Sequence, residues 1–316
     1  MFYLGADVGS TKTDAIIADE AGQVLGFGES GPGNHEVVGY AGLAQALYES
    51  VRQALSVACL KKEQIRGAGF GISGYDWPSE RELTLQAIAS LGLNAPVEAV
   101  NDAILGLLAG SSQGWGIAVV SGTGCNCRGW DREHKREGKV TGHGLWMGEG
   151  AGASELVIKA IQAVAHEWTR RGPPTRLTTA FLDHTGSSNL EEMLDGLVNQ
   201  QVILDAKAAP LVFQVAAQGD PVAGEIIHWA GRELGELANA VIRQLAFEEL
   251  DFEVVLMGSM FDGGPMLVKP MRQAIRACAP GARLVRLEKP PVMGAVLLGM
   301  EAAGIKPSPD VRQALK

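Results

Sequence analysis

The sequence predicts an α/β protein of two domains, each built on a mixed sheet with flanking helices. Three observations lead to this. Strand and helix patterns alternate through the first 112 residues, the opening strand–turn–strand pattern at residue 2 returns at residue 116, and 316 residues suffice for two cores. We expect an N-terminal domain over residues 1–112 and a C-terminal domain over 113–316.

The first domain begins with three predicted strands, at residues 2–6, 13–18 and 23–29, joined by short turns. A helix over 40–58 follows, because apolar residues recur at helical spacing and share one face: Leu43, Leu47, Val51, Leu55 and Ala58. Short turns between strands indicate antiparallel pairing. The sheet should therefore start antiparallel.

The rest of this domain alternates strands with helices. We expect a strand at 68–72, a helix entered at Pro78, a strand at 97–100 and a helix over 103–109. Alternation of this kind is typical of parallel crossovers, so the sheet should continue parallel.

The second domain opens with the same pattern. Strands are predicted at 116–120 and 126–130, joined by a Ser-Gly-Thr-Gly turn, with a third strand near Lys139. This repeat predicts two related domains facing one another across a cleft, each offering one backbone-rich turn to the same ligand.

A helical insertion is expected over about 152–248, where Asp220-Pro221 starts a long helix that reaches Glu249. After it we expect a strand at 252–257, a helix at about 265–278, a strand at 283–287 and a last helix from Pro291. The polar tail, 306–316, should lie at the surface.

Composition excludes several classes of function. A net charge of −9 and a pI near 5.2 argue against a nucleic-acid partner or an anionic membrane surface. No secretory signal or membrane span is apparent, and four cysteines are too few for a disulfide scaffold. We expect a cytoplasmic protein.

The first turn carries hydroxyl groups and follows a strand with an acid near its end. Its backbone N–H groups can bind phosphate oxygens, with Asp7 placed near Mg²⁺ or its waters. The candidate phosphate-binding residues are Gly9, Ser10, Thr11, Lys12 and Thr13. A simple hairpin turn is the alternative interpretation. No Walker A motif occurs, which disfavours a P-loop enzyme.

A second turn of the same kind contains Gly122 and Thr123. Its repetition weakens the purely structural interpretation of both turns. Gly258 and Ser259 end a buried-type strand, where a nucleoside could approach the backbone.

Asp102 lies between a predicted strand and a predicted helix. It could serve as the N-cap of that helix. A carboxylate at the carboxyl end of a strand, facing an interdomain cleft, could also act as the general base for a hydroxyl that attacks the γ-phosphate. Residues 142–152 place many glycines around one tryptophan and one glutamate, which suggests a pocket wall, with a mobile surface loop as the alternative.

In this order, the segments resemble the actin-like ATPase superfamily of hexokinases, glycerol kinases and chaperone ATPase domains. Within it, the chain is most similar to the N-acetylglucosamine kinase branch, which shares a family with the BadF/BadG-type ATPases. The segments that carry the resemblance are 7–13, 33–35, 71–74, 101–103, 121–127, 142–152, 258–259 and 290–295.

The resemblance implies an ATP- and Mg²⁺-dependent transfer of the γ-phosphate to the 6-hydroxyl of N-acetylglucosamine or a related hexosamine, such as glucosamine or N-acetylmuramic acid. Asp102 would be the base, Thr11 and Thr123 would hold phosphates, and Gly258 and Ser259 would border the nucleoside. The implied sugar-binding residues are Asn34, Ser73, Gly74, Asn126 and Glu149. By the same analogy we expect a homodimer, and we expect the last helix to pack back onto the N-terminal domain.

One segment departs from the family pattern. The family has Gly-Asp-Glu-Gly-Ser where this chain has Gly148-Glu-Gly-Ala-Gly152. An aspartate that would bind a sugar hydroxyl becomes Glu149, one methylene longer. The departure bears on which hexosamine binds more than on the reaction class.

Two alternatives come from other classes of function. An ATPase that activates a partner enzyme would need cysteines for a shared iron–sulfur cluster, and the only close pair, Cys125 and Cys127, flanks Asn126 inside the second turn. A sugar or nucleotide sensor without catalysis is disfavoured by the presence of Asp102. The six histidines show no zinc-site spacing.

Overall fold

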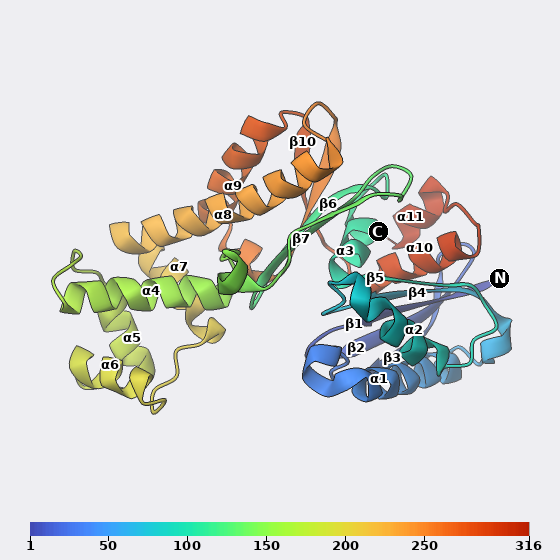
Figure 1. Cartoon of the computed structure of the whole chain (residues 1–316), viewed down its shortest axis with the longest axis horizontal. Coiled ribbons are helices and arrows are strands. Elements are labelled where there is room, and N and C mark those ends of the chain that lie inside the picture. The colour runs from blue at the N-terminus through green and yellow to red at the C-terminus, as the bar shows by residue number, and fades with distance from the viewer. Residues whose placement is uncertain (316) are drawn as a thin grey trace.

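The computed structural model describes residues 1–315, apart from the side chain of Leu145. It contains two five-stranded sheets, each flanked by helices (Figure 1). The prediction of a two-domain α/β fold is confirmed. The boundary near residue 112 is a proposal that follows from the position of the last helix before the second sheet.

The N-terminal sheet has the strand order β3-β2-β1-β4-β5. Its strands are β1 Phe2–Val8, β2 Thr13–Asp19, β3 Val24–Ser30, β4 Ile65–Ile72 and β5 Val97–Asn101. The first three pair antiparallel, whereas β4 and β5 are added in parallel to β1. The mixed character of this sheet therefore follows the prediction.

The C-terminal sheet repeats that topology with the order β10-β9-β6-β7-β8. Its strands are β6 Gly116–Ser121, β7 Cys125–Trp130, β8 Glu137–Lys139, β9 Phe252–Met257 and β10 Ala282–Arg286. Again three strands pair antiparallel and two are added in parallel. The repeat seen in the sequence is thus a repeat of topology.

Helices cover both faces of the N-terminal sheet. On one face lie α1 His35–Val57 and α2 Arg81–Ala89, which bury Leu43, Leu47 and Ile88 in a core with β1 and β4. On the other face lie α3 Asp102–Gly110 and α10 Val292–Ala302. Figure 1 shows α10 and α11 in red beside the blue N-terminal strands, so the end of the chain returns to the first domain.

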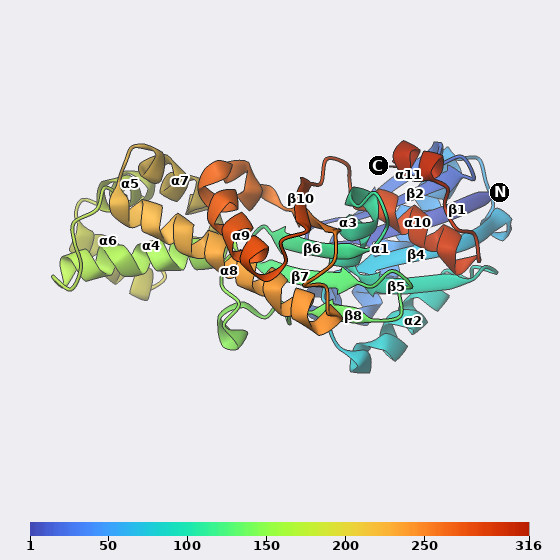
Figure 2. The same ribbon diagram turned by 90° about the horizontal axis from the view of Figure 1, so that it is seen from above.

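The helical insertion lies at the far end of the molecule from the N-terminal sheet (Figures 1 and 2). It comprises α4 Ala153–Trp168, α5 Leu177–Thr185, α6 Leu190–Val198, α7 Ala209–Ala217 and α8 Pro221–Leu245. α8 packs along α9 Pro265–Cys278 and reaches β6, β7 and β8. One core joins the insertion to its sheet.

Between the two sheets lies α3, whose residues 103–110 are all buried. A helix that is apolar on every side must be covered on every side. α3 contacts β4 in one sheet and β6, β7 and β9 in the other. At Gly106 a Cβ atom would lie 2.0 Å from Met257 Sδ, so any larger residue there would displace the Met257 side chain.

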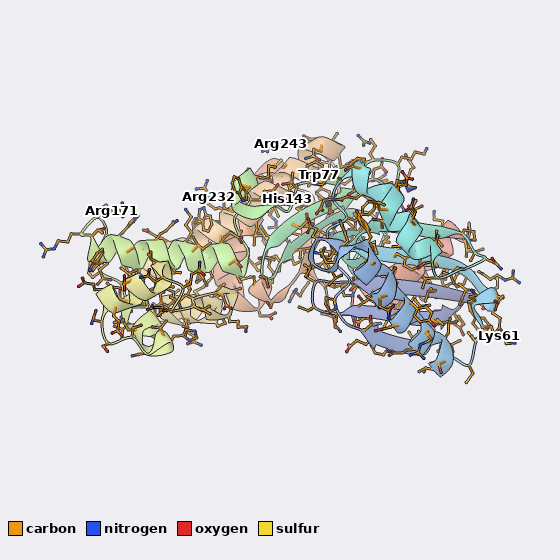
Figure 3. The ribbon with its side chains drawn as sticks, turned by 60° about the horizontal axis from the view of Figure 1, so that its bottom comes forward. Lys61, Trp77, His143, Arg171, Arg232 and Arg243 are labelled. Carbon is orange, nitrogen blue, oxygen red and sulfur yellow. The ribbon has the colours of Figure 1, made fainter. Side chains whose placement is uncertain are left out.

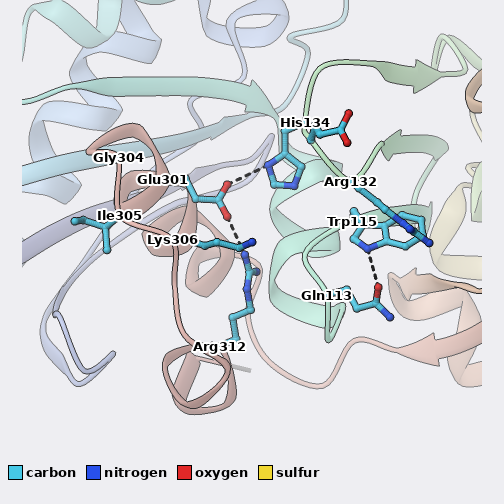
Figure 4. Close-up of a pocket in the computed structure, with 10 residues that line it drawn as sticks. Gln113, Trp115, Arg132, His134, Glu301, Gly304, Ile305, Lys306 and Arg312 are labelled. Atoms are coloured by element: carbon cyan, nitrogen blue, oxygen red, sulfur yellow. Dashed lines mark hydrogen bonds and ion pairs between the residues drawn. The ribbon is translucent and has the colours of Figure 1, made fainter.

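At the rear of the domain junction, a cavity of about 670 Å³ separates the β7–β8 turn from the end of α10 and α11 Pro309–Leu315 (Figure 4). Glu301 accepts from Arg312 Nη2 at 2.8 Å and lies 3.1 Å from His134 Nδ1. The other ring nitrogen, Nε2, is 2.8 Å from the Gly114 carbonyl oxygen. These contacts join the β7–β8 turn to the end of the chain, which packs on the N-terminal sheet.

The structure refines the ends of two predicted helices. A helical turn begins at His35, where Asn34 caps it by accepting from Glu36 N at 2.9 Å, and Gly39, with φ of 69°, separates this turn from the helix predicted from residue 40. The predicted end of α8 at Glu249 is wrong: the helix ends at Leu245, because Ala246 adopts a left-handed conformation with φ of 58°. Most of the tail is exposed as expected, but Leu315 of α11 is fully buried against Gly22, and Lys316 lies outside the described residues.

Among the described residues, no helix is both long enough and apolar enough to cross a membrane.

The close packing of α10 on the N-terminal sheet gives a stability prediction. A Cβ at Gly69 would lie 2.2 Å from the Ala295 carbonyl oxygen and 2.7 Å from Gly299 N. Gly69→Ala should therefore lower the free energy of unfolding by about 1–3 kcal/mol, measured by urea denaturation. Gly224→Ala, in open space on α8, is the control and should be neutral or stabilise by up to about 1 kcal/mol. Equal stability of both variants would contradict this packing.

Candidate active site

The candidate site lies where the strands of both sheets end. Asp7 is near the end of β1, Ser73 follows β4, and Asp102 follows β5. From the other sheet, the turn after β6 and Gly258 after β9 face the same junction. In open α/β sheets, ligands bind beyond the carboxyl ends of the strands, so this edge is the place for a substrate.

The first turn is exposed and offers unpaired donors. Gly9 N donates to Lys12 O at 2.9 Å and closes the turn, while the N–H groups of Ser10, Thr11 and Lys12 meet no acceptor within residues 1–315. Free N–H groups on a concave turn suit phosphate oxygens. The Lys12 ammonium contacts Asp14 Oδ2 at 2.8 Å and Glu29 Oε2 at 3.3 Å.

Thr13 lies differently from the other residues of this turn. Its side chain is fully buried as the first residue of β2, and its hydroxyl has no hydrogen-bond partner. A phosphate at the turn would therefore reach the hydroxyls of Ser10 and Thr11 before that of Thr13.

Asn34 joins the first turn to the end of β4. Its Nδ2 group donates to Ser10 Oγ at 3.0 Å and lies 3.5 Å from Ser73 Oγ. Next to it, Gly74 has a φ of 82°, and a Cβ there would lie 2.5 Å from Asn34 Oδ1. The structure therefore brings together the predicted residues of segments 9–13, 33–35 and 71–74.

Asp102 is the first residue of α3, and Asn101 is its N-cap. Asn101 Oδ1 accepts from Ala103 N at 3.1 Å, and Asp102 Oδ1 accepts from the same N–H at 3.0 Å. Asn101 is therefore the N-cap of α3, which is the role that the structural interpretation gives to Asp102. Its second carboxylate oxygen makes no hydrogen bond within the described chain.

Two carboxyl groups of the site have raised pKa values. Burial, together with the negative charge of Asp76, raises the pKa of Asp102 to about 6. Burial, and then the charges of Asp102 and Asp14, raise the pKa of Asp7 to about 8, which Lys12 partly offsets. Carboxyl groups with raised pKa values are common at functional sites, so these two are candidates.

This cluster of carboxylates is suited to a divalent cation, because a positive charge would relieve the repulsion that raises the pKa of Asp7. Mg²⁺ typically takes one or two carboxylates together with phosphate oxygens and water. No group of three or more acidic, cysteine or histidine side chains is arranged as a metal site in the part of the chain described. Asp7 therefore fits Mg²⁺ that arrives with a nucleotide.

Asn126 comes from the other domain and reaches the segment that holds Asp102. Its Nδ2 group donates to Asn101 Oδ1 at 3.3 Å, while its own Oδ1 is buried and has no partner among the described residues. Asn101 Nδ2 in turn donates to Asp76 Oδ1 at 3.1 Å. A buried acceptor without a donor is costly, so this oxygen can accept from a ligand hydroxyl.

Glu149 is 7 % exposed and binds its own loop. One carboxylate oxygen accepts from Thr141 N at 2.6 Å, and the other accepts from Thr141 Oγ1 at 2.8 Å and His143 N at 3.0 Å. The segment does lead into α4, as a pocket wall would, but its Trp146 is 94 % exposed. The aromatic ring therefore does not line the site in this conformation.

The same loop contacts the N-terminal domain. The rings of His143 and Trp77 stack with centroids 5.9 Å apart, and Trp77 Nε1 donates to His143 Nε2 at 3.2 Å (Figure 3). The Lys139 ammonium lies 4.9 Å from the centre of the Trp77 ring. These contacts cross from one domain to the other beside the cleft.

The second turn is held against α4 and opens into a cavity. Ala153 N and Ser154 N donate to the carbonyl oxygens of Gly122 and Thr123, at 2.8 and 3.0 Å. The N–H groups of Thr123 and Gly124 have no acceptor in the described chain. Gly258, with a φ of 100°, lies so close that a Cβ would be 2.2 Å from the Ser121 carbonyl oxygen.

The cavity beside this turn measures about 580 Å³. Ser259 lines it as predicted, but most of its wall is contributed by residues that sequence reasoning missed: Ala206, Lys207, Ala209, Pro210, Phe213, Gln214, Met260, Asp262 and Gly263. A mostly apolar cavity with free N–H groups at its mouth suits a nucleoside that carries phosphates. No local motif marks these residues, because the insertion helices only form the wall after folding.

Two of the four cysteines are buried behind the second turn, whereas Cys59 is exposed and Cys278 is partly buried. Cys125 and Cys127 are both buried, and burial raises the pKa of both thiols, that of Cys125 to about 11. Cys125 Sγ accepts from Ala151 N at 3.4 Å. These thiols therefore pack behind the second turn rather than facing a partner surface.

Two domains of one topology, with a phosphate-type turn in each, define an ATPase of the actin-like class. A family model described as the BadF/BadG/BcrA/BcrD ATPase family matches residues 4–299. The chain belongs to this family.

Two curated relatives are sugar kinases. The chain is 26% identical over 314 residues to the N-acetyl-D-glucosamine kinase of Dictyostelium discoideum, covering 95% of this chain and 98% of the relative. It is 25% identical over 302 residues to the N-acetylmuramic acid/N-acetylglucosamine kinase of Clostridium acetobutylicum, covering 94% and 97%.

Solved structures agree with the fold. A candidate N-acetylglucosamine kinase from Chromobacterium violaceum has a TM-score of 0.70 at 25% identity, covering 94% of this chain and 98% of its own. A ROK-family glucokinase from Streptomyces griseus, solved with glucose and AMPPNP, has a TM-score of 0.54 at 19% identity, covering 99% and 98%, and supports the fold alone.

The contacts of Glu149 give a prediction about its loop. Glu149→Gln keeps the length but leaves one acceptor oxygen instead of two. The backbone amides of Thr141 and His143 should then exchange with solvent about tenfold faster, measured by hydrogen–deuterium exchange. The exposed Glu191→Gln is the control and should change neither amide. Unchanged exchange at both amides would show that Glu149 does not hold the loop.

Proposed function

We propose that the protein is an ATP-dependent amino-sugar kinase. It transfers the γ-phosphate to the 6-hydroxyl of N-acetylglucosamine or a related hexosamine, such as glucosamine or N-acetylmuramic acid. The observation that carries the proposal is the position of Asp102. This carboxylate, with a raised pKa, stands at the head of α3 between two turns whose N–H groups are free.

The nucleotide would lie across the second turn. Its base would occupy the cavity lined by Phe213 and Met260, bordered by Gly258 and Ser259. Thr123 would bind phosphate oxygens from one side, and Gly9 to Lys12 from the other. Mg²⁺ bound with the nucleotide would neutralise charge on the transferring group, with Asp7 as its protein carboxylate.

The sugar would lie against the polar side chains that surround Asp102. Asn126 offers a buried acceptor, and Asn34, Ser73 and Gly74 form the opposite wall. Glu149 would act chiefly by shaping the loop next to Asn126, since a Cβ on Gly142 would lie 3.5 Å from Asn126 Cγ.

In the transfer step, the oxygen of the sugar 6-hydroxyl attacks the γ-phosphorus and Asp102 takes the hydroxyl proton. The bond between the γ-phosphorus and the β–γ bridging oxygen breaks, and ADP leaves. A pKa of about 6 leaves the carboxylate ionised at neutral pH, yet basic enough to accept a proton. The N–H groups of the two turns stabilise charge on the phosphoryl oxygens. Side chains at the junction exclude water and so limit hydrolysis of ATP.

The names of the curated relatives favour an N-acetylated hexosamine as the substrate. The alternatives are an ATPase that activates a partner enzyme, and a sensor without catalysis. The cytoplasmic location, the homodimer and the boundary near residue 112 stay predictions.

The decisive experiment measures product formation with Mg²⁺ and ATP. The panel is N-acetylglucosamine, glucosamine, N-acetylmuramic acid, glucose, N-acetylmannosamine and no sugar. We expect a sugar phosphate with one hexosamine, and Asp102→Asn should lower kcat about 10³-fold while ADP affinity is retained. Equal, slow ADP formation in every tube would favour the alternatives.

The wall of the nucleotide cavity gives a second prediction. Phe213→Ala should raise the KM for ATP about tenfold and leave the KM for the sugar within about twofold. Trp168→Ala, an aromatic residue that is 52 % exposed at the end of α4, is the control and should change neither constant. An unchanged KM for ATP in Phe213→Ala would place the nucleotide elsewhere.

A further inference from the structure

A buried ion pair joins the two domains beside the candidate base. Arg128 of β7 is 2 % exposed, and its Nη2 group donates to Asp76 Oδ1, in the loop that follows β4. Its Nη1 group contacts Glu137 Oε1 of β8 at 2.8 Å. A buried arginine in a strand must have a partner, and here the principal one lies 52 residues away in the other domain.

The side chain of Asn101 connects this ion pair to the start of α3, where Asp102 lies. Asp76 Oδ1 also accepts from Asn101 Nδ2 at 3.1 Å. Asn101 Oδ1 accepts from Ala103 N at 3.1 Å and so fixes the first turn of α3, which begins with Asp102. Asn126 Nδ2 donates to the same oxygen at 3.3 Å. Hydrogen bonds through the Asp76 carboxylate, the Asn101 side chain and the Ala103 N–H group thus connect Arg128 to Asp102.

The loop that carries Asp76 is held by further cationic and aromatic contacts. The Asp76 carbonyl oxygen accepts from Lys139 Nζ, and the next residue, Trp77, stacks on His143. All these partners come from the C-terminal domain. The position of Asp76 therefore depends on how the two domains meet.

We infer that Arg128 and Asp76 form a positioning pair for phosphoryl transfer. Arg128 holds Asp76 in place, and Asp76 in turn holds Asn101. The carboxylate of Asp102 therefore faces the sugar hydroxyl only when the two domains are joined. The inference rests on the proposed function and deepens it. In the proposed arrangement neither residue would contact the reacting atoms, so both are positioning residues, and neither was singled out by the sequence.

The pair also acts on Asp102 through its charges, which have opposite signs. The charge of Asp76 raises the pKa of Asp102, and that of Arg128 lowers it. The other charged group coupled to Asp102 is Asp7 of β1, whose own pKa is raised by the charge of Asp102. Neutralising the two members of the pair should therefore move the ionisation of Asp102 in opposite directions.

Three variants test the inference: Asp76→Asn, Arg128→Gln and Arg128→Lys. For the first two, kcat should fall about 10- to 100-fold with the KM for ATP within about threefold, because the base is displaced while the nucleotide site is intact. Arg128→Lys should recover part of the loss. Glu137→Gln is the control, since it removes the other partner of Arg128 without touching Asp76 or Asn101, and should keep kcat within about twofold.

A measurement that needs no turnover separates this inference from the proposed function. The ionisation of Asp102 is followed by carboxyl ¹³C NMR, assigned with Asp102→Asn, without metal or nucleotide. We expect its midpoint to fall by about half a unit or more in Asp76→Asn and to rise in Arg128→Gln. If Arg128→Gln does not fold, the double variant Asp76→Asn/Arg128→Gln replaces it, and its midpoint should lie above that of Asp76→Asn alone.

Midpoints that do not move, or that move in the same direction in both single variants, overturn the inference even if a sugar is phosphorylated. If the midpoints shift in opposite directions but the protein phosphorylates no sugar, the effect of the pair on Asp102 is supported and the proposed kinase function is rejected. A loss of kcat that parallels a loss of thermal stability, with unmoved midpoints, would reduce the pair to a structural contact.

Discussion

The burial of α3 between the two sheets is the constraint on which the rest of this structure depends. Its residues 103–110 are buried, and it contacts strands of both domains. A helix without a polar face can only be accommodated where elements cover it all round. The hydrophobic core therefore fixes the N-terminus of α3 at the domain junction. Asp102 lies there because α3 packs between the sheets, and no contact within the site is needed to place it.

The two domains repeat one topology but use their turns differently. The first turn is exposed and bordered by Asn34 and Ser73. The second is bonded to the start of α4 and opens into the cavity beside Phe213. Free N–H groups in both turns suit phosphates, and a mostly apolar cavity lies beside the second turn. The insertion after the second turn thus contributes a cavity wall that the proposed nucleotide site would use.

Many polar side chains near Asp102 stabilise the helix ends and loops around the site. Asn34 caps α1, Asn101 caps α3, and Glu149 holds the loop that precedes it. These three side chains are each oriented by a backbone partner, as expected where a substrate must be met without reorganisation. The buried oxygen of Asn126 that lacks a donor, and the acidic group of Asp7 and Asp102, are the positions where a ligand hydroxyl and a cation would complete the site.

The sequence by itself determined the strands and helices, the repeat of topology and the turns, because periodicity and turn chemistry are encoded within a few residues of chain. The strand at 252–257 and the helix at 265–278 have the boundaries that were predicted. Only the tertiary structure decided that α8 stops at Leu245, that Leu315 is buried, that Phe213 lines a cavity and that Arg128 pairs with Asp76. These features depend on which distant surfaces meet in the folded chain. No local sequence pattern predicts a contact between side chains that lie 52 residues apart.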